Sequence, residues 1–152
     1  MIWTYAHNSD STAFVEEFVD DIWNQQRFER LPSYLHADYR QVDERAEVIV
    51  RGRDEYARSV ESTLELITDA RMRVTHAVCS GSGFAYRWEL TGWIADLEVL
   101  GPGLRMIARQ LPDVRLISMT GMNIARVADG LIVEEINELD PQSVTEQMGW
   151  WR

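Results

Sequence analysis

The sequence predicts an α+β fold in which helical segments come first and paired strands follow. Residues 10–23 and 57–67 repeat apolar side chains at helical spacing, whereas residues 71–93 and 116–139 alternate them with a period of two. Short turn signals rich in glycine separate the alternating segments. With a length of 152 residues, the chain is expected to form a single domain spanning 1–152.

The first helix is expected from Asp10, because Asp10 or Ser11 can cap it and acidic residues lie in its early turns, where the helix dipole favours them. Its apolar stripe consists of Phe14, Val15, Phe18, Val19, Ile22 and Trp23. A short helix or turn is expected at 31–35, where a proline fits the first helical position. Extended chain is predicted over 39–50.

A break at 51–54 precedes the second helix, and the inner face of that helix carries Ala57, Val60, Leu64 and Ile67. A strand is predicted from Arg71, with Met72, Val74, His76 and Val78 on its apolar face. On that face His76 is expected to be a core imidazole. After a turn at 80–83, a second strand over 84–93 places Phe84, Tyr86, Trp88 and Leu90 opposite Arg87, Glu89 and Thr91.

Residues 94–112 show no clear period and are interpreted as a loop that could cover a cavity. The last hairpin is predicted from strands at 116–127 and 131–139, joined by an Asp-Gly turn. Asp140 is expected to cap a final helical turn, with a proline behind it. The strands together are expected to form an antiparallel meander.

Composition excludes several classes of function. The chain has 25 acidic and 15 basic residues, so its net charge of −10 disfavours nucleic acid and anionic membrane surfaces as partners. It has no apolar run long enough for a membrane span, and Cys79 has no second cysteine to pair with. We therefore expect a cytoplasmic protein. No spacing suggests a metal site or a phosphate-binding loop, so neither is expected.

The motifs at 51–54, 86–92, 129–134 and 147–149 occur in an order and spacing that resembles the SnoaL-like polyketide cyclase family, over nearly the whole of 14–149. The resemblance implies a cone-shaped α+β barrel of the ketosteroid-isomerase and nuclear-transport-factor kind, with N-terminal helices packed on a curved antiparallel sheet and an apolar pocket between them. It further implies a homodimer formed through the open sheet face. Cyclases of this family close a ring by intramolecular aldol condensation without metal or organic cofactor.

The family resemblance places a general acid/base aspartate at position 137 and a histidine at position 123, where this chain has Asn137 and Asn123. An amide cannot take up a proton, although it can orient or polarise a carbonyl group. Glu135 shares the strand face of Asn137. It is either a solvated strand glutamate or a replacement carboxylate with a pKa raised by an apolar wall.

The remaining candidates are aromatic and polar side chains that could contact a ligand, namely Trp23, His36, Tyr39, Gln41, Trp88, Trp93 and Met122. Arg87 and Glu89 resemble the arginine and acid of limonene-type epoxide hydrolases, which share the cone fold. Residues two apart lie on one strand face, so a structural ion pair is the other interpretation.

The sequence thus favours a cofactor-free polyketide cyclase of secondary metabolism that acts on a hydrophobic small molecule. With Asn137 in place of the acid, a pericyclic or template mechanism is one possibility. An isomerase, a hydratase or an epoxide hydrolase that uses Glu135 or Glu89 is the enzymatic alternative. A non-catalytic small-molecule-binding protein is the alternative from another class.

Overall fold

The computed structural model describes residues 9–43, 45, 47–94 and 116–139 of the chain. Its elements are α1 (Ser9–Val19), a π-helical turn η1 (Asp20–Asn24), a 3-10 helix η2 (Phe28–Ser33), β1 (Leu35–Val42), β2 (Val48–Arg51), α2 (Gly52–Leu66), β3 (Ile67–Ser80), β4 (Gly83–Ile94), β5 (Leu116–Ala128) and β6 (Leu131–Leu139). The predicted covering loop after Ile94 and the predicted cap at Asp140 lie outside the described residues.

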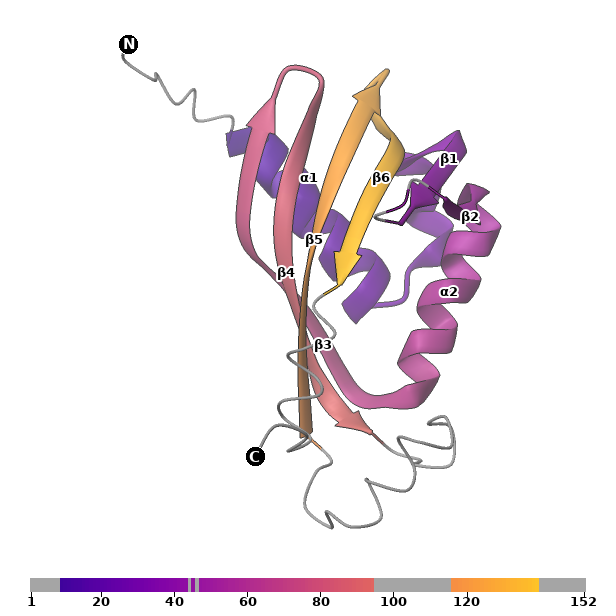
Figure 1. Cartoon of the computed structure of the whole chain (residues 1–152), viewed down its shortest axis with the longest axis vertical. Coiled ribbons are helices and arrows are strands. Elements are labelled where there is room, and N and C mark those ends of the chain that lie inside the picture. Colours follow the sequence, from indigo (N-terminus) through magenta and orange to yellow (C-terminus); the bar gives the residue numbers. More distant parts are fainter. Residues whose placement is uncertain (1–8, 44, 46, 95–115, 140–152) are drawn as a thin grey trace.

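The strands form one curved, unclosed sheet of six strands in the order β2-β1-β6-β5-β4-β3 (Figure 1). The predicted meander is confirmed for β3 to β6, which pair in antiparallel fashion in chain order. It is wrong at β1, which pairs with β6 in parallel. The Ile132 backbone N–H donates to the Tyr34 carbonyl (2.8 Å), which joins the chain entering β1 to the start of the last strand.

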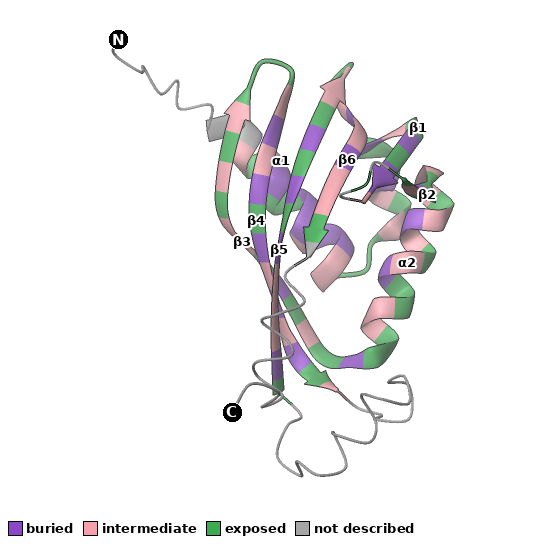
Figure 2. Ribbon diagram, viewed as in Figure 1, coloured by how far each residue is buried: buried purple, intermediate pink, exposed green. Residues whose placement is uncertain are grey.

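The helices lie on one face of the sheet, and the core lies between the two layers (Figures 1 and 2). Aromatic rings fill much of it: Phe18 packs against Tyr34 and Tyr56, with ring centroids 5.3 and 6.0 Å apart. The predicted apolar stripe of the first helix is confirmed, since Val15, Phe18, Val19 and Ile22 are buried. No helix among the described residues is both long and apolar enough to cross a membrane.

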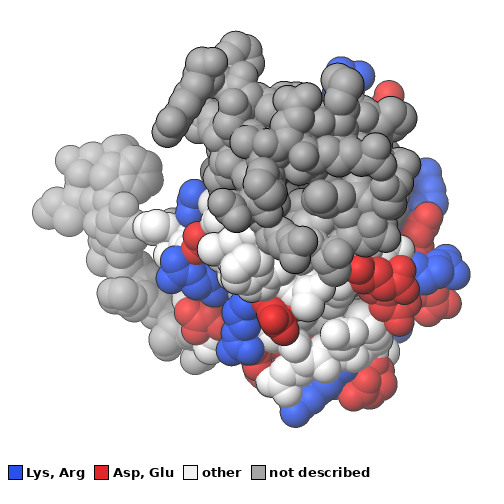
Figure 3. Space-filling view, turned by 90° about the horizontal axis from the view of Figure 1, so that it is seen from below, with Lys and Arg blue, Asp and Glu red and all other residues white. Residues whose placement is uncertain are grey.

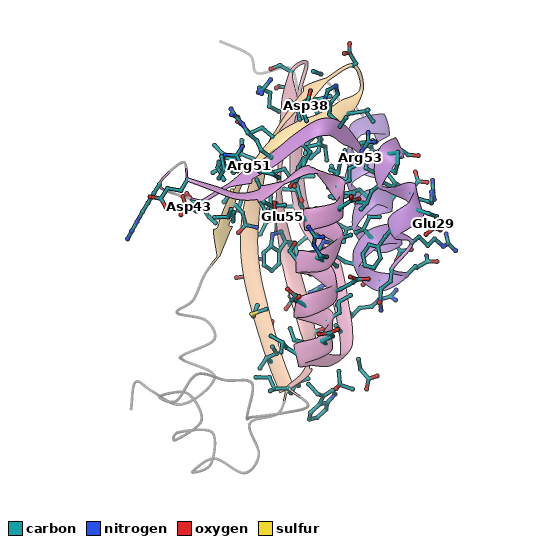
Figure 4. All side chains as sticks on the ribbon, turned by 90° about the vertical axis from the view of Figure 1, so that its right-hand side faces the viewer. Glu29, Asp38, Asp43, Arg51, Arg53 and Glu55 are labelled. Carbon is teal, nitrogen blue, oxygen red and sulfur yellow. The ribbon has the colours of Figure 1, made fainter. Side chains whose placement is uncertain are left out.

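The predicted extended segment at 39–50 is divided into two strands by a turn. The Asp43 carboxylate accepts hydrogen bonds from the backbone N–H groups of Arg45 and Glu47, each 2.9 Å long, and so stabilises the turn. At the end of β2, Glu55 accepts a bond from the Arg51 backbone N–H (2.6 Å) at the start of α2 (Figure 4). Arg53 donates to the Leu35 carbonyl (2.8 Å), which ties the start of α2 to β1.

Strand β3 differs from its predicted pattern at a bulge. The register with β4 shifts between Val74 and His76, so the inward-facing positions change from even to odd numbers. Ala77 and Cys79 therefore pack against the core, and His76 is exposed. The interpretation of His76 as a core imidazole is wrong. By contrast, the predicted faces of β4 are confirmed, because Phe84, Tyr86, Trp88 and Leu90 are all buried.

Candidate functional site

A cavity of about 290 Å³ lies between the inner face of the sheet and the helices. It is lined by Trp23, Gln41, Ile49, Val50, Tyr56, Ser59, Thr63, Met72, Tyr86, Trp88, Leu90, Met119, Asn123 and Asn137. These residues come from η1, α2 and all six strands, so the complete fold is needed to form the wall. Among the described lining residues none carries a charge, and the polar groups are amides, hydroxyls and indole N–H groups.

A carboxyl group lies one layer behind this wall. Glu135 on β6 is 0% exposed, and it accepts hydrogen bonds from the Tyr39 hydroxyl (2.7 Å) and the Tyr86 hydroxyl (2.8 Å). Tyr86 lines the cavity, so its phenol connects the cavity to the carboxyl group. The interpretation of Glu135 as a solvated strand glutamate is wrong.

Burial raises the pKa of Glu135, because a buried carboxylate loses its hydration. Hydrogen bonds from Tyr39, Tyr86 and Asn123 oppose this effect on the pKa of Glu135, but they do not cancel it. Burial and the neighbouring Glu135 also hold the pKa values of Tyr39 and Tyr86 well above the usual tyrosine range, so both phenols remain protonated. The raised pKa therefore keeps the Glu135 carboxyl group protonated to a higher pH than an exposed glutamate.

Two amides stand side by side next to this carboxyl group. Asn123 and Asn137 are register partners on β5 and β6, and Asn137 Nδ2 donates to Asn123 Oδ1 (3.2 Å). Trp88 Nε1 donates to the same oxygen (2.9 Å). With its oxygen held by two donors, the Asn123 amide directs its nitrogen to Glu135, and its hydrogen bond there lowers the pKa of that carboxyl group.

Trp23 and Tyr56 complete the polar part of the wall. Trp23 Nε1 donates to the Tyr56 hydroxyl oxygen (3.2 Å), and the Tyr56 ring packs edge-on against the Tyr39 ring at 5.4 Å.

The sequence did not identify Tyr56 or Tyr86 as site residues. The signal for Tyr86 was present, because the period of β4 placed it on the inner face. Tyr56 comes directly before the first residue of the predicted inner face of α2.

Comparison with known proteins supports the fold and gives the family. A family model described as a SnoaL-like domain matches residues 15–135. The chain belongs to the SnoaL-like domain family. A search of curated proteins finds no match.

Solved structures extend the likeness of this SnoaL-like chain to nearly its whole length. IdmH from Streptomyces antibioticus shares 22% identity with a TM-score of 0.69, covering 94% of this chain and 99% of that one. A SnoaL-like polyketide cyclase from Agrobacterium tumefaciens shares 15% with a TM-score of 0.63, covering 85% and 91%. A protein with a ketosteroid isomerase-like fold from Catenulispora acidiphila shares 17% with a TM-score of 0.65, covering 91% and 96%. At these identities the likeness shows the ketosteroid isomerase-like fold.

The structure brings most of the residues predicted from the SnoaL-like resemblance to one place. Trp23, Gln41, Trp88, Asn123 and Asn137 line the cavity, whereas Glu135 and Tyr39 lie behind its wall.

Three predicted ligand contacts lie elsewhere in this SnoaL-like domain. His36 is half-buried at the start of β1, where its Nδ1 accepts from the Asp38 backbone N–H (3.1 Å). Trp93 and Met122 are 46% and 45% exposed, and neither lines the cavity. Met122 faces away because it is adjacent to the inward-facing Asn123 on the same strand.

The predicted ion pair between Arg87 and Glu89 is wrong. Glu89 pairs instead with Arg73, from Nε to Oε2 at 2.7 Å, and this hydrogen bond lowers the pKa of Glu89. Arg87 contacts the Thr75 hydroxyl (3.2 Å). Directly opposite residues on paired strands are closer than residues two apart on one strand, so the cross-strand partners prevail. Both side chains project from the outer face of the sheet, away from the cavity.

Charges gather on the outside of the SnoaL-like domain rather than at its cavity. Viewed from below, arginine and acidic side chains alternate over the described part of that face, without a large patch of one sign (Figure 3). No group of three potential metal ligands occurs among the described residues. At the inner site, Glu135, its tyrosines and the two amides can support proton transfer and hydrogen bonding.

Proposed function

We propose that this SnoaL-like protein is a cofactor-free enzyme that closes a ring in a neutral, hydrophobic, polyketide-like substrate, with Glu135 as the acid and base. The observation that supports this most directly is the fully buried carboxyl group with a raised pKa, joined to an uncharged cavity by the Tyr86 hydroxyl. The name of the Agrobacterium tumefaciens neighbour, a SnoaL-like polyketide cyclase, supports the same class of reaction.

The proposed reaction begins with enolisation. Tyr86 donates its proton to a substrate carbonyl oxygen and receives the proton of Glu135, which leaves a carboxylate stabilised by Tyr39, Tyr86 and Asn123. The carboxylate then takes up, through Tyr86, a proton from the carbon next to that carbonyl. The enol carbon attacks a second carbonyl, one C–C bond forms, and the enol proton passes to the new alkoxide, so that no net proton is consumed.

The amides have a supporting part in this proposal. Asn137 lies at the cavity wall, where its side chain can hydrogen-bond a substrate carbonyl and stabilise developing negative charge. Asn123 is held by Trp88 and Asn137 and acts on the carboxyl group rather than on the substrate. The acid therefore occupies position 135, whereas the family resemblance implies position 137.

Turnover of a synthetic linear poly-β-ketone ester by wild type and Glu135→Gln tests the proposal. The variant should lose at least about 100-fold in kcat, the range expected for removing a general acid or base. Glu134→Gln is the matched control, since the Glu134 carboxylate pairs with Arg40 and Arg126 outside the cavity. Full turnover by Glu135→Gln would overturn the acid/base role and leave ring closure by shape alone. Tight binding of the ester by wild type without conversion would favour a non-catalytic binding protein.

A double-bond isomerase is the second candidate, because the same enolisation without attack on a second carbonyl would move a double bond. The fully buried Glu135 favours it as well, since proton return to a different carbon needs a base shielded from water. Product analysis of the same assay separates the two reactions, because only ring closure removes a carbonyl group from the substrate. An epoxide hydrolase that uses Arg87 and Glu89 is not supported, since neither residue lines the cavity.

A further inference from the structure

One buried amide in the cavity wall has no partner. Gln41 on β1 is only 9% exposed and lines the cavity, yet its side chain makes no hydrogen bond to any of the described residues. A primary amide has two donor hydrogens and one acceptor oxygen. No side-chain N or O atom among the described residues is fully buried without a partner, so the unpaired amide atoms of Gln41 are accessible and a ligand in the cavity can reach them.

The other polar groups of the wall are largely committed. Asn123 Oδ1 accepts two hydrogen bonds, and the hydroxyls of Ser59 and Thr63 donate to carbonyls of their own helix at 2.8 and 2.9 Å. Tyr56 Oη accepts from Trp23, and among the described residues no group accepts the Tyr56 hydroxyl proton. The wall therefore offers a ligand both hydrogen-bond donors and acceptors. The Gln41 amide provides a donor N–H and an acceptor oxygen within a single planar group.

The position of Gln41 places this amide next to the proposed acid. Gln41 is the register partner of Glu135 in the parallel pairing of β1 and β6, and it lies two residues after Tyr39 on the same strand face. A carbonyl oxygen held by Gln41 would therefore lie at the end of the cavity that Glu135 and its tyrosines close.

We propose that Gln41 is the ligand-recognition residue of this cavity, and that it selects an uncharged carbonyl compound with an O–H or N–H donor beside the carbonyl. The Gln41 N–H donates to the ligand's carbonyl oxygen, and Gln41 Oε1 accepts from the adjacent donor. Lactams have this edge, and an enolised 1,3-dicarbonyl has the same two groups separated by two further carbon atoms. The inference rests on the proposed function only in assigning the ligand to this cavity. It names the class of substrate on which Glu135 would act.

Charge supports the choice of an uncharged ligand. A carboxylate or phosphate would need a cation or several aligned N–H donors once removed from water. Neither arginine nor histidine lines the cavity among the described residues, and the nearest charge, when Glu135 ionises, is negative. An anionic ligand of the same size would therefore be repelled.

Isothermal titration with 2-quinolone, a bicyclic lactam, and with 1-methyl-2-quinolone, which lacks the N–H donor, tests the proposal. Wild type should bind 2-quinolone at least about tenfold more tightly than its methylated analogue, and 2-naphthoate should bind more weakly than either. Gln41→Leu keeps the approximate volume of the side chain and removes both polar groups. It should abolish the preference for 2-quinolone, and cooperative thermal unfolding of the variant should show that the loss comes from the missing amide and not from a failure to fold.

The same titration of Glu135→Gln separates this inference from the proposed function. That variant should keep the preference for 2-quinolone while losing turnover, whereas Gln41→Leu should raise KM of the poly-β-ketone ester more than it lowers kcat. Equal affinity of wild type for the two quinolones, no binding of 2-quinolone, or an unchanged preference in Gln41→Leu would each overturn the assignment of Gln41. Loss of turnover in Glu135→Gln would leave the proposed function standing in any of these cases.

Discussion

Replacing Glu135 by glutamine should remove a pH dependence of stability that the buried carboxyl group imposes. In the folded protein the pKa of Glu135 is raised by burial, whereas in the unfolded chain it returns to the ordinary glutamate value of about 4.3. Between these two values the folded state holds one proton more than the unfolded state. Stability contributed by the group is therefore complete below pH 4.3 and is lost as pH rises toward the folded pKa.

The magnitude follows from proton linkage. A difference of one bound proton makes the free energy of unfolding fall by about 1.4 kcal/mol for each pH unit within this window. Above the folded pKa the slope vanishes, because both states are then ionised. Glutamine keeps the shape of the side chain and can still bond the hydroxyls of Tyr39 and Tyr86. The titration is removed, and one of the two tyrosine hydroxyls accepts a hydrogen bond from the amide nitrogen instead of donating one.

Urea unfolding of wild type and Glu135→Gln from about pH 4.5 to about pH 8 measures the effect. The difference between the two free energies of unfolding isolates Glu135, since other groups titrate equally in both proteins. Glu134→Gln, measured in the same way, should retain the wild-type slope.

A difference curve that is flat across this range would show that Glu135 titrates alike in the folded and unfolded chains. A difference that rises with pH would show that the tyrosines and Asn123 stabilise the carboxylate more than burial destabilises it. Either result would refute a raised pKa of Glu135 in the folded protein.

Four further substitutions test other parts of the structure. Tyr39→Phe removes a donor that lowers the pKa of the buried carboxyl group, so the falling part of the same stability curve should extend to higher pH, with a stability loss of about 1–3 kcal/mol. Gly121→Ala would place a methyl group against the Trp88 indole and 2.7 Å from the Glu138 carbonyl oxygen, so thermal unfolding should show a loss of about 1–3 kcal/mol. Glu89→Gln breaks a surface pair, so turnover should be unchanged and urea unfolding should show less than about 1 kcal/mol of lost stability. We propose that a second copy of the chain covers the outer sheet face, where Ile124 is 52% exposed, so Ile124→Glu should convert a dimer to a monomer in sedimentation velocity, and a monomeric wild type would contradict this.

Local patterns were sufficient to predict most of the strands, and long-range pairing explains where they failed. The alternation in β4 identified its inner face correctly, because period-two burial is a property of one strand. The bulge at Val74–His76 depends on register with the neighbouring strand, so no count along β3 could reveal that His76 faces outward. The parallel pairing of β1 with β6 joins segments about 96 residues apart and has no local signal either.

In the candidate site, too, local sequence patterns predict one part and long-range strand pairing decides the other. Strand parity placed Glu135 and Asn137 on one face, yet it could not tell a solvated face from a buried one. The burial of Glu135 arises from Tyr39 on β1 and Tyr86 on β4, which enclose it from the two sides of β6. Only the order of strands in the sheet brings those phenols to the same carboxyl group.

The proposed acid at position 135, instead of position 137, changes what catalysis at the site requires. Residues two apart on a strand are separated by about 6.8 Å along it. Glu135 therefore lies about 6.8 Å along β6 from position 137, where the family resemblance places the acid. At position 137 a carboxyl group could touch the substrate directly, as Asn137 can, because that position lines the cavity. At position 135 it is sealed by two tyrosines and cannot touch the ligand without an intermediary. Tyr86 is the phenol that both bonds the carboxyl group and lines the cavity, so the relocation of the acid requires a relay through Tyr86, and Tyr86→Phe should abolish turnover as completely as Glu135→Gln.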